Sequence, residues 1–427
     1  MKDVLFLQLN EINFDLASRY RDKLKLEGFK KVFSLDYIET NSEENYDLLE
    51  PWIQWPSIHT GLSAKEHKIF RLGDVIFSDK ENIFKFAENL NYKVGVISAM
   101  NLKNDLKKAS FFIPDPWTKT SSGNTFWEKI ITSFVKQSVN DNSSNKITLK
   151  SYFFIFLTFL RFFDFKNLYT YLQLALLSKG RPWRKALFLD LLLSDVFFKL
   201  RKNYETNFST LFLNAGAHIQ HHYLYNSTFN ENYNKNPEWY VSSSFDPIEE
   251  MFSIYDRIIQ KALRSISDKI IIATAISQEF DEKSIFYYRP KNHESFLTSL
   301  SIKFKKVYPR MTRDFLIEFD SEEDADVALE KLNKIYLNKE KLFFYPEKRE
   351  KSLFVTLGYR KEIKKDDSIL VGSKKINMFR NLSFVALKNG KHSSKGYLFL
   401  SKNMAEIPLN KNLNVKDIFS ILKNYLT

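Results

Sequence analysis

The chain has 427 residues, enough to bury a large core and to form several domains or one large α/β domain with insertions. Its 44% hydrophobic and 16% aromatic content excludes a disordered chain, and the absence of cysteine excludes disulfides and thiolate metal sites. The formal charge of +13 is spread along the chain without a dense basic cluster, which favours a solvated lysine-rich surface over a nucleic-acid site. Composition therefore predicts a folded protein, in agreement with a cytoplasmic location.

Short apolar runs alternate with amphipathic helices along the chain. Strands are expected at 4–9, 93–98, 208–214 and 269–274. Helices are expected after the first strand, at 83–90 and from Asp246, where a capping residue is followed by Pro247 at the first helical position. This alternation predicts an α/β fold with a mainly parallel sheet and helices on both faces.

Two segments interrupt the alternation. Residues 124–206 are helical in pattern and rich in aromatic residues, and residues 284–378 read as a small α+β insert. Part of the second segment, near 313–336, resembles a strand and helix of an RNA-recognition domain, but the aromatic stacking motif of such domains is not evident. The remaining segments, 1–123, 207–283 and 379–427, are expected to form the α/β core.

The most hydrophobic stretch, 152–165, is shorter than the roughly 20 residues of a spanning helix and contains Arg161 and Asp164. We therefore expect no transmembrane helix there. Two alternatives stay open for 151–178: an ordinary buried helix, or an interfacial helix that gives the protein a peripheral membrane contact. The apolar run at the N-terminus is too short for a signal-peptide core.

Polar residues gather where the predicted strands end, which is where open α/β sheets bind ligands. These places are Asn10 and Glu11, the segment 50–61, the segment 214–222, the segment 277–279, and His392 near the C-terminus. Three of the seven histidines, His218, His221 and His222, follow one strand directly. At helical spacing such imidazoles can share a metal, although exposed or core histidines are the commoner outcome.

Several motifs occur in a recognisable order. LEPWIQW at 49–55 is followed by HTGL at 59–62, EH at 66–67 and LGD at 72–74. In this order the chain resembles the alkaline phosphatase superfamily, in particular its type I phosphodiesterase/nucleotide pyrophosphatase branch and a bacterial subgroup with the LEPWIQW…HTGL motif. The resemblance covers the first 100 residues, 208–280 and 380–400, and leaves both inserts uncovered.

In active members of that superfamily, two divalent metals flank a Thr or Ser nucleophile. The resemblance implies that the family's ligand positions fall on Asn10, Asn214, His218, Gln278, Glu279 and His392. Three carboxylates of the family thus correspond to amides here, while two histidines are retained. Because each such change removes a charge and a strong oxygen ligand, we expect no usual two-metal site.

Two alignments place the family's nucleophile at different residues of this chain. Counting back from the Thr60-Gly61 pair gives Glu50 or Pro51, whereas matching the Trp-Pro pair gives Gln54. Neither choice supplies a hydroxyl. Ser57 and Thr60 lie nearby, but Ser57 would require a shifted helix. Glu50 can alternatively serve only to begin a helix with Pro51.

Two hypotheses follow from these residues. The first is a hydrolase or transferase acting on a phosphate, sulfate or glycosyl ester, in surface-polysaccharide metabolism as the resemblance suggests. Its catalytic groups would be Glu11, Glu50, Gln54 and Glu279; its ligand-binding residues Asn10, Asn214, His221 and Gln278; and its metal ligands, for zinc or manganese, His218 and His392. The second is a catalytically degenerate protein that binds a phosphorylated or carbohydrate ligand.

Overall fold

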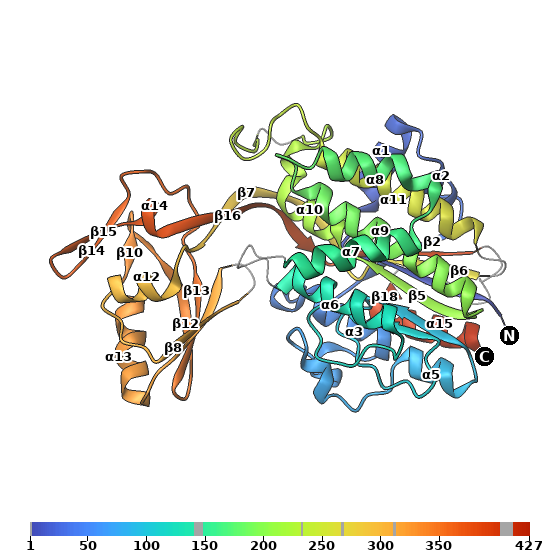
Figure 1. The fold of residues 1–427 in the computed structure, drawn as a ribbon, viewed down its shortest axis with the longest axis horizontal. Helices are drawn as coiled ribbons and strands as arrows, with labels where there is room; N and C mark the ends of the chain where they lie inside the picture. Colours follow the sequence, from blue (N-terminus) through green and yellow to red (C-terminus); the bar gives the residue numbers. More distant parts are fainter. Residues whose placement is uncertain (1, 141–147, 232–233, 266–268, 311–312, 402–412) are drawn as a thin grey trace. The chain divides into compact units, whose positions relative to one another are not determined.

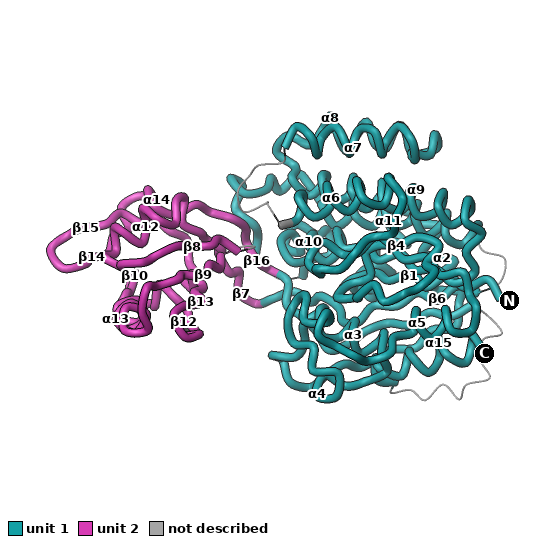
Figure 2. Tube along the Cα trace, turned by 60° about the horizontal axis from the view of Figure 1, so that its bottom comes forward, with its two compact units in different colours: residues 1–139, 147–281, 390–427 teal, residues 140–146, 282–389 magenta. Residues whose placement is uncertain are grey.

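The computed structural model describes residues 2–140, 148–231, 234–265, 269–310, 313–401 and 413–427. It divides into two compact units, shown in Figure 2. Unit 1 comprises 1–139, 147–281 and 390–427, and unit 2 comprises 282–389 together with 140–146. We describe each unit by itself.

Unit 1 is built on an eight-stranded, mainly parallel sheet. In spatial order its strands are β18 (Leu413–Asn414), β2 (Asp36–Asn41), β17 (Lys395–Leu400), β6 (Lys269–Ala273), β1 (Val4–Leu9), β5 (Phe208–Leu213), β3 (Val94–Ile97) and β4 (Phe111–Ile113). Only β17 runs antiparallel to its neighbours, β2 and β6. The predicted α/β class with a mainly parallel sheet is confirmed, and the strands at 4–9, 93–98, 208–214 and 269–274 are present.

Central strands are buried on both faces, which explains why they read as continuous apolar runs. Along β1, Leu5, Leu7 and Leu9 contribute to one hydrophobic core, while Val4 and Phe6 contribute to a second. Because successive side chains point to opposite faces of a strand, these two cores lie on the two sides of the sheet.

Helices cover both faces (Figure 1). The core that contains Leu5 also holds residues of α1 (Phe14–Leu24), α2 (Glu27–Val32), α6 (Phe126–Asn140), α7 (Leu149–Phe162), α8 (Leu168–Leu176), α9 (Trp183–Asn203), α10 (Ala215–Tyr223) and α11 (Pro247–Arg264). The other core holds residues of α3 (Pro51–Thr60), α5 (Ile83–Asn89) and α15 (Ile418–Leu426), and the short α4 (Ala64–His67) follows α3 in the chain.

Helix α11 illustrates how the local sequence sets an element. Asp246 is its N-cap and accepts hydrogen bonds from the backbone N–H groups of Ile248 and Glu249, while Pro247 occupies the first turn. Proline costs nothing there because its missing N–H would be unsatisfied in any case. The helix begins where the sequence predicts.

The segment predicted as a helical insert, 124–206, carries α6, α7, α8 and α9, and its residues 124–139 and 147–206 belong to unit 1. Long amphipathic patterns account for these helices, of which α9 is the most buried. Among the described residues, no helix is both long and apolar enough to cross a membrane.

Unit 2 contains the segment predicted as an α+β insert, 284–378. Its four-stranded antiparallel sheet has the order β12 (Phe343–Arg349), β13 (Ser352–Leu357), β9 (Asp314–Glu318) and β8 (Lys306–Pro309), accompanied by α12 (His293–Ser299) and α13 (Glu322–Asn333). A separate hydrophobic core, including Phe315, Ile317 and Leu353, holds it together. Smaller elements are β10 (Tyr336–Leu337), β11 (Glu340–Lys341), β14 (Ser368–Val371), β15 (Lys374–Asn377) and α14 (Met378–Asn381).

The chain passes between the units along two strands that pair with each other, β7 (Ser277–Pro290) and β16 (Leu382–Ser393). The first residues of β7 and the last residues of β16 belong to unit 1. Gln278 and His392 therefore lie in the same unit as the carboxyl end of β1.

Candidate functional site

Glu11 lies just beyond the carboxyl end of β1, in a turn with an unusual backbone. Its φ of 59° places it in the left-handed region, which costs a residue with a side chain roughly 1–2 kcal/mol. Two hydrogen bonds to its carbonyl oxygen hold this turn, from the Gln278 backbone N–H at 3.1 Å and from Gln220 Nε2 at 3.0 Å. A strained, buried carboxylate that the surroundings hold so firmly is typical of a functional site.

Three side chains from different parts of the chain converge at this turn. Glu11 Oε2 lies 3.0 Å from His221 Nε2 and 3.2 Å from His392 Nε2, and the two imidazole nitrogens are 3.3 Å apart. Glu11 follows β1, His221 lies on α10 and His392 lies near the end of β16. The sequence alone names all three residues, but it pairs His392 with His218 as metal ligands.

The spacing of these three atoms fits a small divalent ion. Zinc binds imidazole nitrogen and carboxylate oxygen at roughly 2.0–2.2 Å, so neighbouring ligand atoms of a tetrahedral site are about 3.3–3.5 Å apart. The three separations in the structure, 3.0, 3.2 and 3.3 Å, are close to that edge length. These residues are also the one group of three His, Asp or Glu side chains, among the described residues, whose ligand atoms lie within 4.8 Å of one another.

Gln278 closes the cluster from β7. Its Nε2 donates to Glu11 Oε2 and lies 3.0 Å from His221 Nε2. Its Oε1 is buried and has no hydrogen-bond partner among the described residues. Rotation of the amide by half a turn would exchange its two polar atoms and turn Oε1 toward His221 and Glu11.

The charge of the cluster is set by its own members. Burial alone raises the pKa of the Glu11 carboxyl, but the imidazoles of His221 and His392 outweigh burial, and the pKa lies well below its usual range. Glu11 is therefore a carboxylate at neutral pH, which is the form that coordinates a metal.

Glu50 is the N-cap residue of α3, and its carboxylate approaches the cluster. Its Oε2 lies 3.6 Å from His392 Nδ1, beyond hydrogen-bond length but within ion-pair range. A carboxylate next to the second nitrogen of a ligating histidine commonly fixes the ring's orientation. The Glu50 side chain is one-third exposed, so it also contacts solvent.

Gly390 allows β16 to approach the other elements closely. A Cβ atom at this position would lie 2.6 Å from Gln278 Oε1 and 2.7 Å from the Gln220 carbonyl oxygen. Any side chain would push the strand away, and His392 two residues later would move with it. The glycine is thus needed for close backbone approach.

Asn10 and Asn214, which the resemblance equates with metal-binding aspartates, bind each other instead. Asn10 Nδ2 donates to Asn214 Oδ1 at 2.8 Å and to Glu11 Oε1 at 3.1 Å, and Asn10 Oδ1 accepts the Trp55 Nε1 hydrogen at 2.8 Å. All polar atoms of the Asn10 side chain are engaged in this network. Two aspartates could not make the contact without a cation between them, whereas two amides can.

The other predicted residues are not brought to the cluster. Gln54 Nε2 donates to the Leu48 carbonyl oxygen, so of the two candidates for the nucleophile position it is Glu50 that lies near His392. Glu279 is exposed and, next to the inward-facing Gln278 on a strand, points to the opposite side. His218 is exposed on α10, and its ring packs at 4.9 Å from that of His222.

Ser57 and His67 form a buried pair that resembles a nucleophile and base, but its hydrogen bonds exclude that role. Ser57 Oγ lies 3.1 Å from His67 Nε2, and His67 Nδ1 accepts the backbone N–H of Ile69 at 2.9 Å. Because Nδ1 is an acceptor, the ring proton is on Nε2, and this nitrogen donates to Ser57. His67 therefore cannot take a proton from Ser57 in this arrangement.

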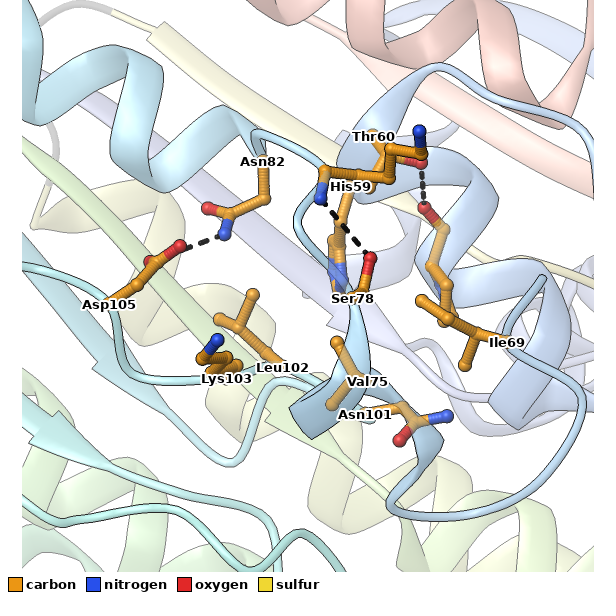
Figure 3. A pocket seen from close by; sticks show the side chains of 12 residues that line it. His59, Thr60, Ile69, Val75, Ser78, Asn82, Asn101, Leu102, Lys103 and Asp105 are labelled. Atoms are coloured by element: carbon orange, nitrogen blue, oxygen red, sulfur yellow. Dashed lines mark hydrogen bonds between the residues drawn. The ribbon is translucent and has the colours of Figure 1, made fainter. Parts of the chain in front are cut away.

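A separate pocket lies beside the second half of α3 (Figure 3). Its lining residues are Pro56, His59, Thr60, Ile69, Val75, Ser78, Lys80, Asn82, Asn101, Leu102, Lys103 and Asp105, and none of them belongs to the cluster. Asn82 Nδ2 and Asp105 Oδ1 are 3.4 Å apart on one side of it. Burial lowers the pKa of His59 to about 3, so this imidazole is neutral.

The sequence did not predict the residues whose hydrogen bonds hold the backbone around Glu11 and Gln278. Gln220 bonds both the Glu11 carbonyl oxygen and, through Oε1, the Asn13 backbone N–H; Asn13 Nδ2 in turn donates to the Gln278 carbonyl oxygen. Asn13 also caps α1. Only the capping pattern of Asn13 is visible in the sequence, and it indicates a helix start rather than a support for the site.

Fold and cluster together define an α/β protein in which a buried glutamate and two partly buried histidines meet at the carboxyl edge of a mainly parallel sheet. No protein-family profile matches the sequence, and no curated protein matches it by sequence. Among solved structures, a phosphonoacetate hydrolase from Sinorhizobium meliloti 1021 is similar, with 12% identity, a TM-score of 0.46, and coverage of 100% of this chain and 96% of that one.

Two further similar structures are human ectonucleotide pyrophosphatase/phosphodiesterase 5 and the alkaline phosphatase of the Antarctic bacterium TAB5. The first has 11% identity, a TM-score of 0.42, and coverage of 100% and 95%; the second has 10% identity, a TM-score of 0.40, and coverage of 100% and 98%. At such identities the likeness concerns the fold alone.

Proposed function

We propose that this chain is a hydrolase of phosphate esters that uses one divalent metal held by Glu11, His221 and His392. The observation that carries the proposal is the spacing of the three ligand atoms, 3.0, 3.2 and 3.3 Å, around a common point. Two imidazoles and one carboxylate with a fourth position left for water or substrate form a common catalytic zinc set. Zinc is therefore our first choice, and manganese is the alternative.

When bound, the metal would supply Lewis-acid polarisation of the ester and lower the pKa of a coordinated water. The protein's own part is positioning and proton transfer. Glu50, whose carboxylate lies 3.6 Å from His392 Nδ1, is the residue we assign to accept the proton of the attacking water, a role for which its partly exposed side chain must turn from His392 toward the metal position. Asn214, partly exposed at the same edge, offers an uncharged amide where a carboxylate would repel an anionic substrate.

The finer substrate class rests on the motif resemblance. The resemblance predicts a glycan-linked phosphate or a sulfate ester as substrate. It also predicts a role in bacterial surface-polysaccharide metabolism. Two features of the site agree with such substrates. The partly exposed Glu50 lies beside it, and amides stand at Asn10, Asn214 and Gln278, where carboxylates would repel an anion.

Metal analysis of the purified chain, combined with hydrolysis of p-nitrophenyl phosphate and its diester, tests the proposal. We expect about one zinc or manganese per chain, lost in Glu11→Gln, His221→Ala and His392→Ala, with hydrolysis reduced by about 10³-fold or more. The matched control is His218→Ala, an exposed histidine on the same helix, which should keep both metal and activity. Loss of metal in His218→Ala but not in His221→Ala would overturn the assignment.

One observation favours the second hypothesis, a protein that binds its ligand without turnover. The Asn10–Asn214 hydrogen bond joins two positions that the resemblance assigns to metal ligands, and among the three side chains of the cluster none is a hydroxyl nucleophile. Glu50→Gln separates the two hypotheses. If wild type hydrolyses the esters and Glu50→Gln retains metal but loses activity, the binding-only hypothesis is excluded; bound metal with no hydrolysis by wild type would favour it.

A further inference from the structure

Helices α7 and α8 present large apolar side chains to solvent. On α7 the exposed residues include Leu149, Tyr152, Phe153, Phe156 and Leu160, and the α8 region adds Phe165, Leu168, Tyr169, Leu172, Leu176 and Leu177. We call these eleven residues the outer apolar face. Single exposed hydrophobic residues need no explanation, but eleven of them on two successive helices indicate an interaction surface.

The exposed apolar residues of α7 share one side of the helix. Positions 149, 153, 156 and 160 recur at three- and four-residue intervals, so their side chains lie in one stripe. The opposite side of the helix is buried through Ser151, Thr158 and Phe162. Phe154, Ile155 and Phe159 also pack against the core of unit 1, so α7 has apolar side chains toward the protein as well as toward solvent.

The buried carboxylate of Asp195 holds the connection between α7 and α8 in place. Asp195 of α9 accepts hydrogen bonds from the Asp164 backbone N–H, from Asn167 Nδ2 and from the Tyr171 hydroxyl. Lys261 Nζ bridges Asp195 and Asp164 at 2.8 and 2.9 Å. Because these bonds fix the turn between the two helices, the outward orientation of the apolar face is built into the fold.

The charges around the face are almost all positive. Between 148 and 185 the basic residues are Lys150, Arg161, Lys166, Lys179, Arg181, Arg184 and Lys185, and the single acidic residue is Asp164. Asp164 is already paired with Lys261, and Arg184 with Glu250. The exposed charges at the border of the face, including Lys150, Arg161 and Lys166, are cationic.

We propose that the outer apolar face docks on an anionic phospholipid bilayer, with its Phe, Tyr and Leu side chains in the headgroup boundary. Apolar helix faces bordered by Lys and Arg bind such surfaces through buried apolar area and through attraction to anionic lipids. A second copy of the chain is a poorer occupant, because a symmetric dimer would bring the same cationic borders together. Docking is interfacial, since no helix among the described residues can span a bilayer.

Co-sedimentation of the full-length protein with sucrose-loaded vesicles tests this proposal. On vesicles with about 30% phosphatidylglycerol we expect at least about tenfold stronger binding than on pure phosphatidylcholine. Phe153→Ser/Phe156→Ser/Leu160→Ser should weaken binding by about tenfold or more, and because these side chains are over half exposed the triple variant should remain folded. Lys150→Glu/Lys166→Glu should weaken binding to the anionic vesicles by a similar factor.

The matched control is Lys31→Glu/Lys65→Glu, which reverses two exposed charges on α2 and α4 and should leave binding unchanged. Circular dichroism and the unfolding midpoint establish that each variant is folded. Absence of wild-type binding, equal binding to neutral vesicles, or equal loss in the control pair would overturn the proposal. So would a dimer in sedimentation equilibrium that the triple variant dissociates while vesicle binding is unaffected.

Discussion

At the scale of single residues, Asn10 joins the cluster to its neighbours through three hydrogen bonds. Its amide donates to Asn214 Oδ1 and Glu11 Oε1 while its carbonyl accepts from Trp55, so the side chain is used completely. The structure thereby gives a physical reason for the amide: at this position a carboxylate would face one carbonyl oxygen and one carboxylate. In the proposed function, the cluster of Glu11, His221 and His392 accordingly holds one ion.

Asn10→Asp tests this reading of the network. The new carboxylate would lose both donated hydrogen bonds and lie beside Glu11, so we expect the free energy of unfolding to fall by about 1–3 kcal/mol in chelating buffer. Urea unfolding measures the change. Asn203→Asp, at an exposed position at the end of α9, should cost at most a few tenths of a kcal/mol. Equal stability of Asn10→Asp and wild type would show that the amide is not required.

His67 predicts a pH dependence of stability. Burial lowers the pKa of this imidazole from 6.5 to about 4, so the unfolded chain takes up its proton at higher pH than the folded chain. The corresponding stabilisation is complete above about pH 6.5 and is lost as the pH falls toward 4, amounting to about 3 kcal/mol. His67→Asn keeps an acceptor for the Ile69 N–H but cannot be protonated. Its urea midpoint should therefore vary less between pH 6.5 and 4 than that of wild type; parallel curves would contradict the prediction.

At the scale of elements, the sequence predicts those that a single local pattern determines. The sequence of strand β1 is a continuous apolar run because both of its faces are buried. The start of α11 is predicted by its N-cap, Asp246, and by Pro247 in its first turn. Strands β2 and β17 were not predicted, since their burial depends on pairing with each other across more than 350 residues of sequence. Helix α1 ends at Leu24 because the chain turns at Lys25, with φ of 55°, and Gly28 lies inside α2.

The same limit applies to the site. Position at strand ends was enough to single out Glu11, His221 and His392, because parallel strands bring their carboxyl ends to one edge. It could not decide between His218 and His221, one helical turn apart on α10, since that choice depends on the rotation of the helix over the sheet. Packing of Ile219 and Gln220 against the core fixes that rotation and turns His221 toward Glu11.

Strand β16 carries a prediction about how His392 is positioned. In Gly390→Ala the added methyl would meet Gln278 Oε1 and the Gln220 carbonyl oxygen at 2.6 and 2.7 Å, and neither can move without disturbing the Glu11 turn. We expect the affinity for zinc to fall by about 10–100-fold, as for other residues that position metal ligands. Titration with a competing chelator measures it. Lys391→Ala, one residue along the strand, is the control, and equal affinities in the two variants would exclude the proposed role of Gly390.

At the scale of the whole molecule, the chain has two kinds of core. The two hydrophobic cores of unit 1 share the strands of one sheet, as the alternation of Leu5 and Phe6 shows, whereas the core of unit 2 is formed by its own residues, such as Phe315 and Leu353. Units with separate cores are expected to open as separate cooperative units. Every member of the Glu-His-His cluster belongs to unit 1, although His392 is reached only after the chain has passed through unit 2.

Metal binding should therefore stabilise one unit and leave the other unchanged. A ligand that binds only the folded state adds about 2.7 kcal/mol at a free concentration of 100 times its Kd. Hydrogen exchange followed by mass spectrometry, with and without zinc, locates this gain. We expect slower exchange in β1, β5 and α10 of unit 1 and unchanged exchange in β9, β13 and α13 of unit 2, with Glu11→Gln abolishing the difference. Protection that appears equally in both units would mean that they do not open independently, and protection confined to unit 2 would place the metal elsewhere than at Glu11, His221 and His392.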